Sequence, residues 1–304
     1  MDHYRVVRES QAALQATIDF GSKQLASLGW QSAPGSEADR EIANTEVGSA
    51  GPWGDRPPRT AYAASNLMMT AVLDDLCSLR KILDDTMPVM GPTIVSRSAI
   101  EIASTVWWLM EPRIGVRRRV CRELVVSLTS ARRAKQVAEG MQNTGYHLSR
   151  PEISAAVSDA LQQEADVLRR ISDLGIAPAT GGKFDPKIEN EQASNATEAT
   201  EALLRAAAPI NAPPGTVYRV YSAVMHGELY GLMNFMTLGV SSTGGPVLHW
   251  HLPPDVLDST VQITIVAFQQ VYQRIAKVLG WSPLPGDLWD AKIRKIYLQG
   301  PRGN

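Results

Sequence analysis

Cysteine is almost absent from this chain. The two that occur, Cys77 and Cys121, lie far apart among 304 residues and form no CxxC pair. Their spacing therefore favours neither a disulfide framework nor a zinc ribbon. A reducing compartment suits such a sequence, and we predict a cytoplasmic protein.

Neither sign of charge dominates. The chain carries 30 basic and 31 acidic residues, which gives a formal net charge of -1. A protein so close to neutral has no global field that would draw it to nucleic acid or to anionic lipid. Any phosphate-binding site must therefore be local.

Long uncharged apolar runs are also missing. The segment richest in apolar residues, 93–110, is interrupted by Arg97 and Glu101, so no membrane-spanning helix is predicted. The first twenty residues carry acids and lack the apolar core and cleavage site of a secretory signal. We therefore expect no membrane partner and a mature N-terminus.

Helical periodicity is what the chain does have. It predicts an all-α fold, a bundle of about seven to nine helices in a single domain over residues 1–304. The segment 31–59 is rich in Gly and Pro, which is typical of an irregular loop or lid. A TGG turn between alternating apolar residues predicts a small β-hairpin over 237–252. The expected helices cover 4–28, 60–85, 92–110, 114–141, 151–174, 194–208, 216–236 and 255–279.

A polar stripe follows the predicted helix 216–236. Its members recur at helical spacing and would share one face: Arg219, Ser222, His226 and Tyr230. A guanidinium offers planar donors to a phosphate oxygen, and an imidazole can exchange protons near neutral pH. Arg219 and His226 are therefore candidate catalytic residues, with Ser222 and Tyr230 orienting the bound group. The competing interpretation is a hydrogen-bonded structural seam.

A second stripe follows the predicted helix 92–110 and contains Arg97, Glu101, Ser104 and Trp108. Glu101 is a candidate acid or base, while Arg97 and Trp108 are candidate substrate contacts. The competing interpretation is an ion pair between Arg97 and Glu101 that fixes the helix register. We expect this stripe to face the one that contains Arg219 and His226, with a buried polar site between them.

The segments RSAIEIASTVWWLMEP and YRVYSAVMHGELYG together resemble a family of uncharacterised bacterial all-helical proteins, distantly similar to the HEPN superfamily. The resemblance covers about residues 60–240. Many HEPN proteins are metal-independent ribonucleases whose motif separates an Arg from a His by four to six residues, as Arg219 and His226 are separated. The resemblance therefore implies a hydrolase that binds RNA or a nucleotide, works as a homodimer and needs neither cofactor nor metal. The residue after the motif arginine is commonly polar in active members, whereas here it is Val220.

The alternative is a small-molecule enzyme or binding protein with an apolar cavity between helices. One version of it resembles the class I terpene cyclases, which hold magnesium and diphosphate between an aspartate-rich helix and an Asn, Ser, Glu helix. The residues that carry this resemblance are Asp74, Asp75, Asp84, Asp85, Asn190, Ser194 and Glu198.

The segment 113–135 is locally basic, and two interpretations of it remain open. Its arginines could form an RNA-binding patch. The neighbouring acids Glu111, Glu123 and Glu139 favour an ordinary ion-paired helix surface.

Overall fold

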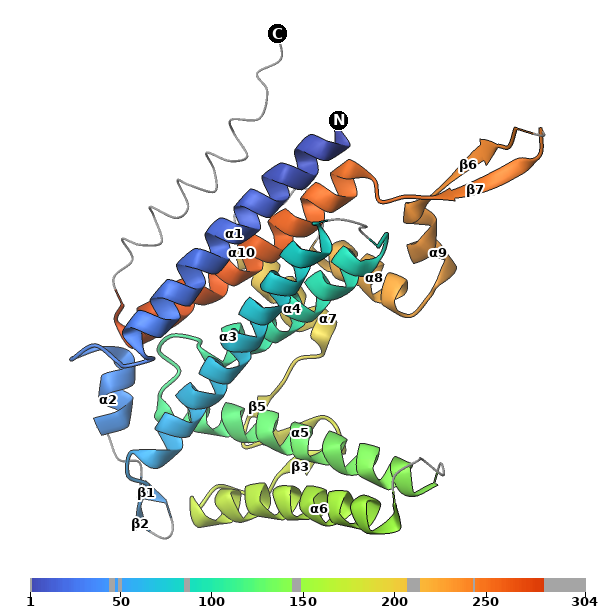
Figure 1. The fold of residues 1–304 in the computed structure, drawn as a ribbon. Helices are drawn as coiled ribbons and strands as arrows, with labels where there is room; N and C mark the ends of the chain where they lie inside the picture. Colours follow the sequence, from blue (N-terminus) through green and yellow to red (C-terminus); the bar gives the residue numbers. More distant parts are fainter. Residues whose placement is uncertain are drawn as a thin grey trace. The chain divides into compact units, whose positions relative to one another are not determined.

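The computed structural model describes residues 2–43, 47–48, 51–84, 88–143, 149–206, 214–242 and 244–281. Within these residues the fold is mostly α-helical, and its strands form only small antiparallel pairs (Figure 1). The predicted all-α class with a minor hairpin is therefore confirmed. The described part contains ten α-helices, more than expected, because two of them, α2 (Glu37–Ala43) and α9 (Leu229–Leu232), are very short.

The chain divides into two compact units, which we describe one at a time. Unit 1 takes its described residues from 1–34, 65–112 and 195–304, and unit 2 from 35–64 and 113–194. Helix α3 (Arg56–Ile82) supplies its first residues to unit 2 and the remainder to unit 1. The single-domain interpretation of the sequence stays a prediction.

Unit 1 is built around α10 (Pro254–Leu279), which packs against α1 (His3–Leu28), α4 (Gly91–Leu109) and α7 (Ala196–Ala206). Phe268 and Val271 of α10 are fully buried in this core. Gly21 allows α1 to come close, because a Cβ atom there would lie 2.8 Å from the Phe268 ring. Helix α8 (Pro214–Met225) packs against α4 and α7, so the two predicted polar segments belong to one core.

Unit 2 contains the long helices α5 (Val116–Asn143) and α6 (Arg150–Asp173), which pack against each other. Glu164 of α6 joins them by accepting from Arg132 and Lys135 of α5, each at 3.0 Å. The short strands β3 (Thr180–Gly181), β4 (Pro186–Ile188) and β5 (Glu191–Gln192) form an antiparallel sheet, and β4 and β5 pack on α5.

The segment 31–59 is more regular than its composition suggested. It contains α2, a two-residue strand pair, β1 (Val47–Gly48) with β2 (Gly51–Pro52), and the start of α3. Ser36 caps α2 by accepting from the Asp39 amide at 3.1 Å, and Glu37 stands in the first turn, where a carboxylate is favourable. Pro57 and Pro58 lie in the first turn of α3, where proline breaks no helical hydrogen bond.

The predicted hairpin is present in unit 1, where β6 (Met236–Val240) pairs antiparallel with β7 (Pro246–Trp250). The pair follows α9 and the short 3-10 turn η1 (Met233–Phe235), and it projects away from the neighbouring helices of this unit (Figure 1). Leu238 stands opposite Leu248 in the register.

Candidate functional site

The stripe that begins at Arg219 does not follow one helix. Helix α8 ends at Met225, and Gly227 adopts a left-handed conformation with φ of 67°. Glycine is the residue that most readily ends a helix in this way. Tyr230 consequently lies on α9, and the prediction of one continuous helix from 216 to 236 is wrong.

Arg219, in the middle of α8, and His226, the residue that follows its last residue Met225, are both exposed. Ser222, which lies between them in the sequence, is half-buried. Tyr230 is exposed. The Tyr230 hydroxyl donates to the carbonyl oxygen of Arg219 at 3.3 Å, which ties the turn after α8 back to that helix. Among the described residues, no carboxylate pairs with the Arg219 guanidinium. These side chains are thus accessible to a ligand from solvent.

The predicted ion pair between Arg97 and Glu101 is present, with 2.8 Å between Nε and Oε1. A third residue that the sequence analysis did not select completes it: the Tyr218 hydroxyl donates to Glu101 Oε1 at 2.5 Å and accepts from Arg97 at 3.1 Å. Burial raises the pKa of Tyr218, and the hydrogen bond to the carboxylate raises it further. The phenol therefore stays protonated as a donor.

Helices α4 and α8 are neighbours, as the two-stripe prediction required. Their polar contact runs through other residues, however. Arg97 reaches α8 at Tyr218 and at the Met225 sulfur, one residue before His226. Trp108 is half-buried further along α4, where Ser104 donates to the Glu101 carbonyl oxygen at 2.8 Å. Arg97 thus holds α8 at Tyr218, next to Arg219, and at Met225, next to His226.

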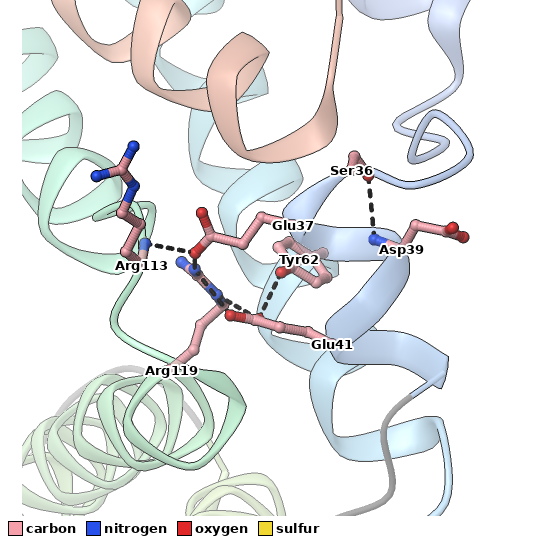
Figure 2. Close-up of polar contacts among 7 residues, drawn as sticks. All are labelled: Ser36, Glu37, Asp39, Glu41, Tyr62, Arg113 and Arg119. Atoms are coloured by element: carbon pink, nitrogen blue, oxygen red, sulfur yellow. Dashed lines mark hydrogen bonds and ion pairs between the residues drawn. The ribbon is translucent and has the colours of Figure 1, made fainter.

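Unit 2 holds a buried polar cluster centred on Arg119 (Figure 2). Its guanidinium lies 2.7 Å from Glu41 Oε2 and 2.8 Å from Glu37 Oε1, and its side chain is 1% exposed. The Tyr62 hydroxyl donates to Glu41 at 2.6 Å, and the Arg113 amide donates to Glu37 at 2.6 Å. Two carboxylates, a phenol and a guanidinium therefore satisfy one another inside unit 2.

In this cluster the Arg119 guanidinium stays positively charged and the Tyr62 phenol stays protonated. Burial lowers the pKa of Arg119, but the hydrogen bond that it donates to Glu41 and the surrounding negative groups more than offset that effect. Burial strongly raises the pKa of Tyr62, so the phenol remains a donor to Glu41. Sequence reasoning missed this cluster because 78 residues separate Arg119 from Glu41. The only local sign was the i, i+4 spacing of Glu37 and Glu41 in the presumed loop.

The remaining arginines at the start of α5 are paired as well. Arg117 binds Glu189, while Arg118 and Arg122 share Glu191. The ion-paired interpretation of this segment fits these contacts better than an open RNA patch, although the partners come from the β4–β5 region. Burial also raises the pKa of Cys121 to about 12, which leaves its thiol un-ionised.

The described residues of unit 2 line at least two pockets. None of the seven predicted site residues lines either of them. The larger, about 630 Å³, borders the Arg119 cluster and is lined by Glu37, Arg40, Glu41, Ala43, Arg113, Gly115 and Val116. The smaller, about 490 Å³, is lined by Gly51, Pro52, Trp53, Arg56, Pro57, Thr60, Arg170, Asp173 and Leu174.

The residues that resembled a terpene cyclase do not form its two helices. Asn190 lies in the turn between β4 and β5 and Ser194 precedes α7, so only Glu198 of the Asn, Ser, Glu series is helical. Asp85 lies outside the described residues. Across the described chain, no group of three or more His, Cys, Asp or Glu side chains has the arrangement of a metal site.

Comparisons of the chain with protein families, with curated proteins and with solved structures found no match. None of the helices in the described ranges combines the length and the apolar character needed to cross a bilayer.

Proposed function

We propose that this protein binds RNA or a nucleotide at Arg219 and His226 and cleaves RNA without a metal ion, as HEPN ribonucleases do. The observation that supports this best is the exposure of both side chains, Arg219 in the middle of α8 and His226 directly after its end. A guanidinium without a carboxylate partner among the described residues is free to take a phosphate oxygen instead.

The chemistry assigns one role to each residue. His226 removes the proton from a ribose 2'-hydroxyl or delivers one to the leaving 5'-oxygen. The 2'-oxygen attacks phosphorus as the bond to the 5'-oxygen breaks, which yields a cyclic phosphate and a free hydroxyl. Arg219 stabilises the negative charge that develops on the phosphoryl oxygens. In the homodimer that the resemblance implies, each subunit contributes one such pair.

The other predicted residues support this pair. Tyr230 holds the backbone at Arg219, and Arg97 contacts Met225 directly before His226. We assign Glu101 to positioning, because its carboxylate is engaged by Arg97 and Tyr218. Ser222 and Trp108 remain candidate contacts for the bound nucleotide.

The alternative, a small-molecule protein with an apolar cavity between helices, would enclose the polar stripe. Arg219, His226 and Tyr230 are instead exposed, and the two cavities of unit 2 are lined by other residues. These observations favour a large ligand approached from solvent over an enclosed metabolite.

The test is cleavage of single-stranded RNA in the presence of EDTA. We expect His226→Ala to lower the rate by about 10²–10⁴-fold, the contribution typical of a positioned acid or base. Arg219→Ala should lower it by about 10²-fold or more, and Arg219→Lys should recover part of the loss, because lysine keeps the charge but not the planar fork.

Two matched controls separate the site from general charge effects. His249→Ala removes an exposed histidine of β7, and Arg205→Ala removes an exposed arginine of α7 that already pairs with Glu201. Both controls should retain wild-type cleavage. Equal activity of the His226→Ala and His249→Ala proteins, or wild-type protein without EDTA-resistant cleavage, would overturn the proposal.

A further inference from the structure

The β6–β7 hairpin presents one entirely apolar face. Residues that alternate along each strand point to the same side of a sheet, so the register defines the members of this face. The most exposed are Leu238 at 75%, Val240 at 74%, Leu248 at 58% and Trp250 at 49%. We call the following six residues the hairpin face: Met236, Leu238, Val240, Pro246, Leu248 and Trp250.

The opposite side of the hairpin has a different character. It carries Thr237, Gly239, Val247 and His249. The His249 ring lies across Gly239, because a Cβ atom added to Gly239 would be only 2.6 Å from that ring. That side is polar and partly filled by its own residues. The hairpin face has no such cover within the described chain. The largest apolar patch of a protein surface is often a functional contact site, and a two-stranded sheet alone is only marginally stable.

We propose that the hairpin face is the contact surface for a second copy of this chain, paired about a two-fold axis. In such a contact each side chain near the axis meets its own copy, so a charged residue there would repel itself. Residues 229–254 contain no Asp, Glu, Lys or Arg, and the pairing therefore meets no like-charge repulsion. The same segment lacks the basic residues that anchor proteins to anionic membranes.

The exposed area is sufficient for this contact. Taking roughly 200 Å² for a fully exposed large side chain, the four most exposed members offer on the order of 500 Å² per copy. Two copies would then bury roughly 1,000 Å², the size at which specific interfaces begin. The hairpin face contains neither Arg219 nor His226, so variants of this face leave both proposed cleavage residues in place and dimerisation can be measured separately from RNA cleavage.

The full-length protein tests this directly by sedimentation equilibrium over two orders of magnitude in concentration. We expect wild-type protein to approach twice its 33.1 kDa chain mass. Leu238→Asp and Leu248→Asp should each raise the dimer dissociation constant by about tenfold or more, because each places a charge against its own copy. Circular dichroism would verify that both variants keep the helical fold.

Thr237→Asp is the matched control, since it adds the same charge next to Leu238 on the opposite side of the hairpin. It should leave the dissociation constant unchanged. A wild-type protein that is monomeric at every concentration overturns the proposal. So does a folded Leu238→Asp protein that dimerises as well as Thr237→Asp, or a monomer that instead cosediments with phosphatidylcholine vesicles.

Discussion

Arg119 in unit 2 and Arg219 in unit 1 show two opposite uses of the same side chain. Arg119 is buried, and two carboxylates take up its charge. Arg219 is exposed, and no described carboxylate binds it. The first arrangement leaves no donor for a ligand and holds three elements of unit 2 together. The second contributes little to the core but keeps its donors available.

The comparison shows why burial alone is a poor guide to a reactive site. The Arg119 cluster combines a cavity, two acids, a phenol and a strongly shifted pKa, features that often mark an active site. Its hydrogen bonds are nevertheless satisfied internally (Figure 2). The Arg219 and His226 pair lacks those marks and is accessible. The contacts support a structural role for the Arg119 cluster, whereas the Arg219 and His226 pair is exposed, as the proposed function requires.

Removing Arg119 should have the largest effect on stability. Arg119→Met leaves Glu41 buried without its cation, so we expect a loss of about 3–5 kcal/mol in the free energy of unfolding of unit 2. Urea denaturation with hydrogen exchange across residues 35–64 measures it. Arg118→Met is the control, because its side chain is 57% exposed and such pairs contribute about 1 kcal/mol or less. Equal losses in the two variants would contradict the structural role assigned to Arg119.

Acid should weaken unit 2 through Glu191. Burial raises the pKa of this carboxyl, but hydrogen bonds from Arg122 and Arg118 outweigh burial and leave the pKa lowered. Because the folded pKa lies below the unfolded one, the stabilisation is complete above the unfolded value, about 4.3, and is lost as the pH falls through the folded value.

Melting temperatures of wild-type and Glu191→Gln protein between neutral and acidic pH test this expectation. The variant should melt lower at neutral pH, and its melting temperature should depend less on pH in the acidic range. The ion pair has no net stabilising effect if the two melting curves coincide at neutral pH.

Replacing Asp75 in α3 should have the smallest effect on stability, because its negative charge is partly buried and only partly compensated. Its Oδ2 atom is buried without a hydrogen-bond partner among the described residues. Burial raises the pKa of this carboxyl and nearby Asp74 adds to the effect, while a hydrogen bond with Ser98 only partly offsets the rise. A raised pKa means that folding is penalised as the pH rises through the folded value, and that the penalty disappears in acid.

Asp75→Asn should therefore stabilise unit 1 at neutral pH by roughly 0.5 kcal/mol, a modest gain because solvent screens a partly exposed group. That corresponds to a rise of about 1–2 °C in melting temperature for a chain of this size. The exposed neighbour provides the control, and Asp74→Asn should change the melting temperature less. A lower melting temperature for Asp75→Asn at neutral pH would show that the carboxylate has a partner it needs.

Several features could be predicted from the sequence because their causes are local. The all-α class follows from apolar residues at helical spacing, and the hairpin from a glycine turn between alternating apolar residues. The ion pair of Arg97 with Glu101 depends on residues one helical turn apart, a distance that the helix itself fixes. Turn residues gave weaker guidance. Gly227 ends α8 before the predicted boundary, and Pro57 lies in the first turn of α3, although its segment was predicted to be an irregular loop.

Contacts between distant segments were decided by tertiary structure. Tyr218 joins the Arg97 pair across 121 residues, and Arg119 meets Glu41 across 78, separations at which no sequence period operates. The exposure of the polar side chains was also decided by tertiary structure, because a polar stripe has the same sequence spacing whether it is buried in a core or exposed to solvent. The sequence alone thus determined which residue types share a helical turn. Packing decided that Arg119 became a buried link between three elements and that Arg219 stayed exposed to solvent.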